Sequence, residues 1–156
     1  MAKNEFADDS AGTCYMGSDG RAVKNKWVKV DGYWYYIKAN SHMAKNEFAK
    51  DSTGTCYMGS DGRAVKDKWV KVNGYWYYMK PNSYMAKNMF ADDSTGTCYL
   101  DSEGRIVKDK WVKVDGNWYY IKPNGYVAKN EYAKDSKATY YMGSDGKIEY
   151  KVSNAA

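Results

Sequence analysis

The chain has 156 residues, enough for one ordinary domain. Leu100 is its only leucine, whereas Trp, Tyr and Phe make up 17% of the residues, so the interior must be built largely from aromatic rings, which suit half-buried strands. The net charge of +5 comes from scattered Lys and Arg residues, and no long apolar run occurs, so the sequence predicts neither nucleic-acid binding nor a membrane span.

From the N-terminus onward, the chain is organised by a 21-residue period in two alternating forms. The A unit has a Trp followed seven residues later by Trp-Tyr-Tyr, and the B unit has Phe or Tyr followed by Thr-Cys-Tyr or Thr-Tyr-Tyr. The opening aromatic residues are Phe6 (B), Trp27 (A), Phe48 (B), Trp69 (A), Phe90 (B), Trp111 (A) and Tyr132 (B). The period predicts a single repeat domain over residues 1–156, with seven units and a short C-terminal cap at about 147–156.

Each A unit predicts a tight β-hairpin. Its Asp31-Gly32 dipeptide, which returns as Asn73-Gly74 and Asp115-Gly116, accepts the positive φ angles of a two-residue type I′ turn. This turn places Val30 opposite Tyr33, Lys29 opposite Trp34, and Trp27 opposite Tyr36. Because side chains alternate along a strand, Trp27, Lys29, Trp34 and Tyr36 are expected on one face.

The B units predict hairpins with a longer loop or a bulge, because their glycines (Gly12, Gly54 and Gly96) come one residue later. Turn residues recur about every ten positions and no 3.6-residue period is sustained, so helices are not expected. A single hairpin is only marginally stable in water, so the hairpins must stack. The sequence therefore predicts an all-β solenoid in which each hairpin contacts mainly its neighbours.

The A unit also resembles a known family. Its pattern, aromatic-Val-Lys-x-x-Gly-x-Trp-Tyr-Tyr at Trp27–Tyr36 with Met-Ala after it at Met43-Ala44, is similar to the choline-binding, or cell-wall-binding, repeats of Gram-positive surface proteins and phage lysins. The resemblance implies a left-handed superhelix with about three hairpins per turn. It also implies that choline groups of teichoic acids bind between consecutive hairpins, enclosed by two aromatic residues of one hairpin and one of the next.

Transferred by position, the resemblance implies three choline sites. They comprise Trp27, Trp34 and Phe48 with Met43; Trp69, Trp76 and Phe90 with Met85; and Trp111, Trp118 and Tyr132 with Val127. Tyr36, Tyr78 and Tyr120 are weaker candidates. Sites opened by a B unit should be empty or weak, because a Thr stands where the second Trp would be, at positions 13, 55, 97 and 139.

The chemistry of such a site follows from its ligand. A quaternary ammonium donates no hydrogen bond, and ring faces attract it through their quadrupole. The alternative is that the Trp residues form only the core between hairpins, and the two roles are compatible. Tyr35, Tyr77 and Tyr119 lie on the opposite face and are expected in the core. The aligned Cys14, Cys56 and Cys98 are expected to be buried thiols and not a disulfide framework.

The function favoured by the sequence is a non-catalytic cell-wall-binding module that recognises choline on teichoic acid. A glucan-binding repeat module and a structural spacer or dimerisation arm are the alternatives. No enzyme is expected, since no catalytic set can be assembled around the single histidine, His42. No cofactor or metal site is expected either, because one His and no Cys-x-x-Cys pair are present.

Two further expectations concern the ends of the chain. Residues 1–6 return as residues 43–48, so we expect a piece cut at a repeat boundary, without its signal or fused domain. The resemblance then implies a secreted protein attached to the cell wall. The alternating run at 147–152 predicts a last strand that either caps the array or pairs with a second copy to give a homodimer.

Overall fold

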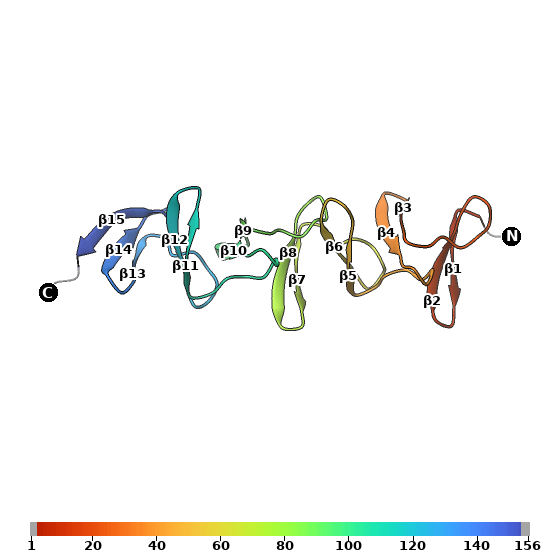
Figure 1. Cartoon of the computed structure of the whole chain (residues 1–156), viewed down its shortest axis with the longest axis horizontal. Helices are drawn as coiled ribbons and strands as arrows, with labels where there is room; N and C mark the ends of the chain where they lie inside the picture. Colours follow the sequence, from red (N-terminus) through yellow and green to blue (C-terminus); the bar gives the residue numbers. More distant parts are fainter. Residues whose placement is uncertain (1–2, 154–156) are drawn as a thin grey trace. The chain divides into compact units, whose positions relative to one another are not determined.

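The computed structural model describes residues 3–153, which form fifteen β-strands and no helix (Figure 1). The strands of the A hairpins are β3 (Lys26–Val30), β4 (Tyr33–Ile37), β7 (Lys68–Val72), β8 (Tyr75–Met79), β11 (Lys110–Val114) and β12 (Asn117–Ile121). The strands of the B hairpins are β1 (Glu5–Asp9), β2 (Gly12–Met16), β5 (Glu47–Lys50), β6 (Thr55–Met58), β9 (Met89–Asp92), β10 (Thr97–Leu100), β13 (Glu131–Lys134) and β14 (Ala138–Met142). Within this part of the chain, no helix could span a membrane.

The predicted register of the A hairpin is confirmed. Strands β3 and β4 pair antiparallel with Trp27 opposite Tyr36, Lys29 opposite Trp34, and Val30 opposite Tyr33. The turn residues Asp31 and Gly32 have φ angles of 52° and 84°, the left-handed conformation that a type I′ turn requires. The same register is found in β11 and β12.

The B hairpins of β5–β6 and β9–β10 have the longer connection that their later glycine predicts, whereas in the first B hairpin Asp9 pairs with Gly12, which leaves a two-residue connection. Between β5 and β6, Lys50 pairs with Thr55, and residues 51–54 form the loop. The Asp51 carboxylate accepts the backbone N–H groups of Thr53 and Gly54, and the Asp51 N–H donates to the Gly54 carbonyl. This local hydrogen bonding closes a four-residue loop without the positive φ pair of the A turn.

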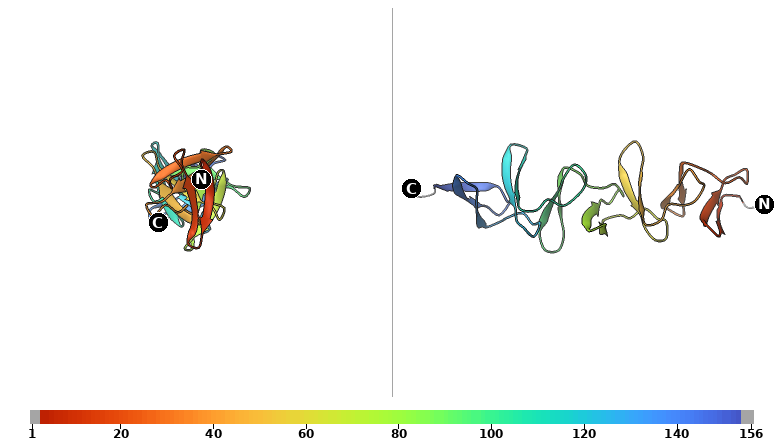
Figure 2. Two further views of the ribbon diagram at one scale, coloured as in Figure 1. Left: turned by 90° about the vertical axis from the view of Figure 1, so that its right-hand side faces the viewer. Right: turned by 60° about the horizontal axis from the view of Figure 1, so that its bottom comes forward.

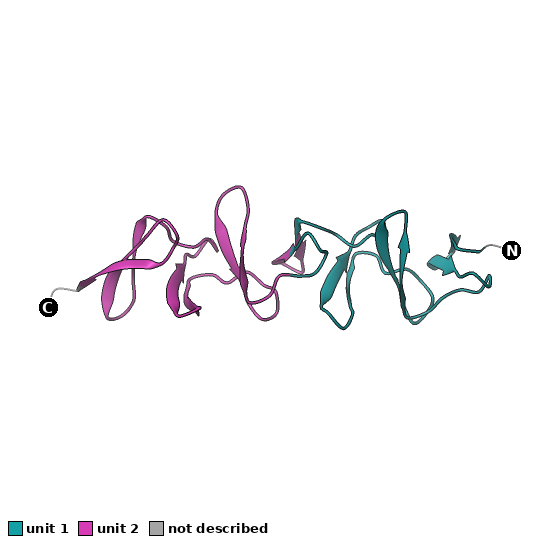
Figure 3. Cartoon of the chain, turned by 90° about the horizontal axis from the view of Figure 1, so that it is seen from above, with its two compact units in different colours: residues 1–69, 79–85 teal, residues 70–78, 86–156 magenta. Residues whose placement is uncertain are grey.

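The contacts divide the chain into two compact units, shown in Figure 3: residues 1–69 with 79–85, and residues 70–78 with 86–156. Figure 2 gives two further views of the hairpins that build them. The expectation of one continuous domain over 1–156 stays a prediction.

In unit 1, each hairpin is tied to a segment thirty residues further along the chain. The backbone N–H groups of Met43, Ala64 and Met85 donate to the carbonyls of Thr13, Trp34 and Thr55, at 2.7, 3.0 and 2.7 Å. Side chains make a similar link, since the Phe6 ring lies 4.8 Å from the Tyr35 ring. These links join one hairpin to the next inside the unit.

The core of each unit consists of short runs of buried side chains. In unit 1, Tyr35, Ile37 and Met43 form one cluster, and Ala44, Ala49, Cys56, Met58 and Ala64 form another. In unit 2, the corresponding clusters are Tyr119, Ile121 and Val127, and Ala128, Ala133 and Met142. The prediction that Tyr35, Tyr77 and Tyr119 belong to the core is confirmed, because each is at most 9% exposed.

The cysteines are free, as the sequence predicts, but differ in burial. Cys56 and Cys98 are buried, whereas Cys14 is only half-buried. At the C-terminal end, β15 (Ile148–Ser153) pairs antiparallel with β14, so the predicted last strand caps a hairpin of its own chain. Homodimerisation stays a prediction.

Candidate functional site

Unit 1 contains a cavity of about 360 Å³ opened by one A hairpin. It is lined by Trp27, Trp34, Asp51, Cys56, Ala64, Asn82, Ser83 and Tyr84. Trp27 comes from β3 and Trp34 from β4. The hairpin register sets both indoles on one face of the two-stranded sheet, so each strand contributes one aromatic wall.

The two indoles are held differently. Trp27 is half-buried, packs against the Ala44–Ala64 core cluster, and has its ring 5.0 Å from the Tyr36 ring. Trp34 is 41% exposed, and the Lys29 ammonium lies 5.8 Å from its ring centroid. Trp27 is therefore a fixed wall, whereas the Trp34 ring is open to solvent and already faces a cation.

Asp51 and Tyr84 line the same cavity and contact each other. The Tyr84 hydroxyl donates to Asp51 Oδ2 at 2.6 Å, and this hydrogen bond leads the interactions that lower the pKa of Asp51. A Cβ atom at Gly54 would lie only 3.2 Å from Tyr84 Cδ1, so the glycine lets the ring pack closely over the loop. The cavity thus combines aromatic walls with an ionised carboxylate.

Cys56 contributes a neutral wall. Burial raises the pKa of its thiol to about 11, and the charge of Asp51 adds to this. At neutral pH the group is a small apolar surface beside Trp27. The expectation of a buried structural thiol agrees with this position.

Unit 2 contains a second cavity, of about 300 Å³, opened by the A hairpin of β11 and β12. It is lined by Trp111, Trp118, Asp135, Lys137, Tyr140 and Ile148. Trp118 is 45% exposed, with the Lys113 ammonium 5.8 Å from its ring centroid. The Tyr140 ring meets Trp111 edge-on at 5.5 Å, and its hydroxyl donates to Asp135 Oδ2 at 3.2 Å. Backbone N–H groups of residues 137 and 138 lower the pKa of Asp135.

Four of the predicted site residues therefore line these two cavities: Trp27, Trp34, Trp111 and Trp118. Phe48, Met43, Tyr132 and Val127 do not line these two cavities. Met43 and Val127 are buried in core clusters. The Phe48 ring lies 5.2 Å from Tyr57. Tyr132 is 59% exposed, with its hydroxyl 3.0 Å from that of Tyr150. Their part in binding stays a prediction.

The second predicted site draws on residues of both units, so its composition stays a prediction. Trp76 is 42% exposed, with the Lys71 ammonium 5.8 Å from its ring centroid. Phe90 packs against Tyr119, and Met85 is buried. Trp69 and Tyr78 both have partners. Of the weaker candidates, Tyr36 packs against Trp27, and the Tyr120 hydroxyl donates to Asp109 at 2.7 Å.

A third cavity, of about 380 Å³, lies beside the first B hairpin. It is lined by Ala11, Gly12, Thr13, Lys38, Asn40, His42, Met43, Lys45 and Glu47. No Trp, Tyr or Phe is among these residues, so the cavity offers no ring face of the kind that a quaternary ammonium needs. The weakness of sites opened by B units stays a prediction, and this cavity agrees with it.

Sequence reasoning overlooked the carboxylate and the tyrosine of the first cavity. Their signal was available, because an Asp recurs every 42 residues, at positions 9, 51, 93 and 135.

A second overlooked pair is Arg63 and Tyr33. The Arg63 guanidinium lies 3.8 Å above the Tyr33 ring, and its Nε donates to the Tyr35 hydroxyl at 3.3 Å. Arg105 and Tyr75 repeat this stacking at 4.0 Å.

Comparison with known proteins follows the same repeats. The family model of cell wall binding repeats matches residues 25–40, 67–82, 109–127 and 130–148. The first three matches begin just before the A hairpins, and the fourth spans β13 and β14. A search of curated proteins returned no match.

Three solved structures illustrate the likeness. Choline binding protein F from Streptococcus pneumoniae, in the presence of a peptidoglycan analogue, is 25% identical with a TM-score of 0.67, over 96% of this chain and 47% of that one. The autolysin LytC from Streptococcus pneumoniae, in complex with a synthetic peptidoglycan ligand, is 28% identical with a TM-score of 0.50, over 99% and 44%. Alternansucrase in complex with isomaltononaose is 22% identical with a TM-score of 0.56, over 94% and 13%, and shows the fold alone.

These comparisons confirm the predicted fold class, an all-β solenoid of stacked hairpins. Its handedness and the number of hairpins per turn stay predictions. The chain spans less than half the length of the choline binding protein F and LytC chains that it matches.

Proposed function

Because the chain belongs to the choline-binding, or cell-wall-binding, repeat family, we propose that its Trp-lined cavities bind the choline groups of cell-wall teichoic acids. The cell-wall-binding role follows from the family, and the choice of choline rests on the cavities. The observation that carries it is the first cavity, where the rings of Trp27 and Trp34 share one space with the Asp51 carboxylate.

This combination suits a quaternary ammonium better than a sugar or a peptide. Such a cation cannot donate a hydrogen bond, so its binding depends on ring faces and on nearby negative charge. The Lys29 ammonium lies 5.8 Å from the centroid of the exposed Trp34 ring, and this supports a role for the ring face in binding a positive group. A desolvated cation–π contact contributes roughly 2 kcal/mol or more.

Several weak sites on one chain favour a polymer over a free ligand. Each bound choline raises the effective concentration of the next site along the same teichoic acid chain, so the avidity exceeds the affinity of one cavity. The net charge of +5 adds attraction to the phosphates of that polymer. In this proposal the protein resides at the cell surface, attached to the wall through these repeats.

The test is retention on a resin that carries immobilised tertiary or quaternary amines, followed by elution with free choline. We expect the unaltered chain to bind and the double variant Trp34→Ala, Trp118→Ala to elute early. Tyr33→Ala is the matched control, because Tyr33 neighbours Trp34 in β4, is 39% exposed, and points to the other face. Retention on immobilised dextran in place of the amine resin would contradict choline binding and favour a glucan.

A further inference from the structure

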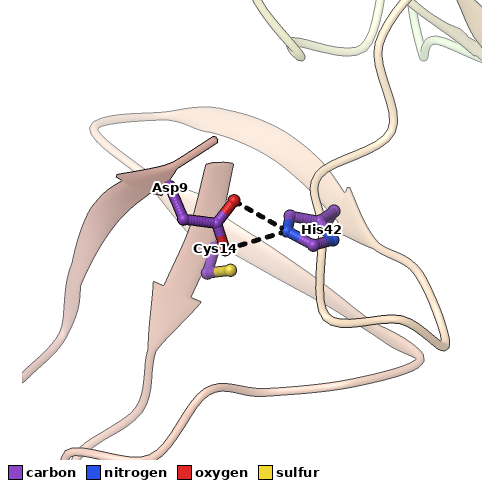
Figure 4. Close-up of side chains that lie close together, drawn as sticks. All are labelled: Asp9, Cys14 and His42. Atoms are coloured by element: carbon purple, nitrogen blue, oxygen red, sulfur yellow. Dashed lines mark hydrogen bonds and ion pairs between the residues drawn. The ribbon is translucent and has the colours of Figure 1, made fainter. Parts of the chain in front are cut away.

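Three side chains that commonly bind metal ions meet at the first hairpin of unit 1. Asp9 ends β1, Cys14 lies in β2, and His42 lies in the loop after β4 (Figure 4). One carboxylate oxygen, the thiol sulfur and one imidazole nitrogen all lie within 4.8 Å of one another. Among residues 3–153, these form the one such group of three or more. The sequence did not predict this group, because His42 lies 28 residues beyond Cys14 in the chain.

The His42 ring is held in place by its surroundings. Its Nε2 atom lies 3.1 Å from both carboxylate oxygens of Asp9. Its backbone N–H donates to Asn40 Oδ1 at 2.9 Å, which fixes the loop. On the other side, a Cβ atom at Gly12 would lie 3.1 Å from His42 Cδ2, so the ring packs directly on the glycine. The His42 ring and the Asp9 carboxylate are therefore positioned before any ion arrives.

The related repeats provide an internal comparison. The residue that corresponds to His42 is Tyr84 in the next repeat and Tyr126 in the one after it. Each tyrosine hydroxyl donates to the equivalent carboxylate, Asp51 at 2.6 Å and Asp93 at 2.7 Å. A neutral phenol is a poor ligand for a divalent ion, whereas imidazole, thiolate and carboxylate are its usual ligands. Only the first repeat carries all three ligand types.

We propose that Asp9, Cys14 and His42 bind a Zn²⁺ ion, with the fourth coordination position left to water. Zinc–ligand bonds of about 2.0–2.3 Å place tetrahedral ligands roughly 3.3–3.7 Å apart. The 3.1 Å separation of His42 Nε2 and Asp9 is close to this value, and the Cys14 sulfur lies within 4.8 Å of both ligand atoms. Sulfur and imidazole ligands select Zn²⁺ over Mg²⁺ and Ca²⁺.

The charges around the thiol agree with this assignment. Burial raises the pKa of Cys14, and the carboxylates of Asp9 and Asp8 raise it further. A divalent cation at the same place reverses the effect of these carboxylates, takes the place of the proton and neutralises the resulting thiolate and Asp9.

The bound ion would join two parts of unit 1 that are distant in sequence. Asp9 and Cys14 belong to the first hairpin, and His42 belongs to the loop that follows the second. The Trp27 cavity uses none of the three ligands. Zinc binding and choline binding are thus separable, and each can be lost without the other.

The experiment is metal binding by the full chain, measured by equilibrium dialysis with Zn²⁺ and by titration with Co²⁺ as a spectroscopic probe. We expect a single tight ion per chain that excess Mg²⁺ does not displace. Co²⁺ should give the sulfur-to-metal absorption that reports a thiolate ligand. His42→Tyr installs the residue of the related repeats, so it should keep the fold. It should raise the zinc Kd more than about 100-fold, because loss of a residue that only supports a ligand raises the Kd by about 10- to 100-fold.

Two controls make the result decisive. Cys14→Ser should remove the sulfur absorption, whereas Cys56→Ser should leave it unchanged. The His42→Tyr chain should still bind the amine resin, which shows that it is folded. If His42→Tyr and Cys14→Ser bind Zn²⁺ as tightly as the unaltered chain, or if Co²⁺ gives no sulfur absorption, the proposal is wrong.

Discussion

The Trp-lined cavities of the two units begin alike and are completed differently. In each, one A hairpin supplies a half-buried and an exposed Trp, with a Lys ammonium 5.8 Å from the exposed ring. Each also contains one carboxylate, Asp51 or Asp135. The first is also lined by Cys56 and Tyr84, whereas the second is also lined by Tyr140 and Lys137.

In the two cavities, tyrosines from different positions of the repeat, Tyr84 and Tyr140, each donate a hydrogen bond to the carboxylate. Tyr140 occupies the place that Cys56 holds in its repeat, yet its hydroxyl donates to the carboxylate of its cavity, as Tyr84 does in the first. A ring and a hydrogen-bond donor for the carboxylate are thus retained. The cation at Lys137 is the main difference in charge, and it should make the second cavity less favourable for a positive ligand.

The largest expected effect comes from the core on the other face of each A hairpin, opposite its two tryptophans. Ile37 in unit 1 and Ile121 in unit 2 are both fully buried at the ends of corresponding strands. Replacing either residue with Ala leaves a cavity and should cost about 2–5 kcal/mol of unfolding free energy. Hydrogen exchange followed along the chain should show the loss of protection mainly in the unit that carries the change, because repeat proteins are stabilised by neighbouring contacts.

Val152→Ala is the control for these changes, because Val152 is 43% exposed and should affect protection little. Equal loss of protection in both units after either isoleucine change would mean that the units unfold together. The two Trp-lined cavities could then not be treated as sites on separately stabilised units.

The next effect separates the two cavities by ligand affinity. Trp34→Ala and Trp118→Ala each remove a ring face whose cation–π contact contributes roughly 0.5–2 kcal/mol, depending on how far the bound cation is desolvated, so we expect Kd at that cavity to rise about 2- to 30-fold. Calorimetric titration with choline should show that Trp34→Ala removes the tighter site and that Trp118→Ala removes the weaker one. The reverse order would contradict the influence assigned to Lys137.

Much of this arrangement could be predicted from the sequence, because it depends on local rules. The Asp-Gly turn and the alternation of faces were sufficient to place Trp27 opposite Tyr36 and to send Tyr35 to the core. Short-range hydrogen bonding and side-chain alternation determine both features, and neither depends on distant parts of the chain.

The residues that line the cavities together with the tryptophans could not be predicted in the same way. Asp51 and Tyr84 are 33 residues apart and meet only through the stacking of successive hairpins. Asp9 and His42 are brought together by the same spacing. The 42-residue recurrence indicates that such residues are equivalent between repeats, but it does not state which neighbour each one contacts.

A smaller effect on stability should be seen at alkaline pH. It concerns Cys56, which lines the first cavity at the position that Tyr140 holds in the second. The folded pKa of Cys56 is about 11, above its ordinary value of 9.0. The unfolded chain therefore loses the thiol proton first, so stability is complete below about pH 9 and declines as the pH rises towards 11. Cys56→Ala should reduce this decline in thermal melts compared at about pH 8 and about pH 10. An unchanged decline in the variant would assign it to other groups.

The smallest effect tests the one charge that distinguishes the second cavity. The backbone N–H of Lys137 donates to Asp135 at 2.7 Å, and this bond is retained in Lys137→Ala, so the change removes only the side chain and its charge. We expect the choline Kd of this cavity to fall about two- to fivefold at low salt, with less change at high salt, because an exposed charge is screened. Lys134→Ala, an exposed position in β13, is the matched control. If both variants gain equally, general positive charge and not Lys137 weakens the second cavity.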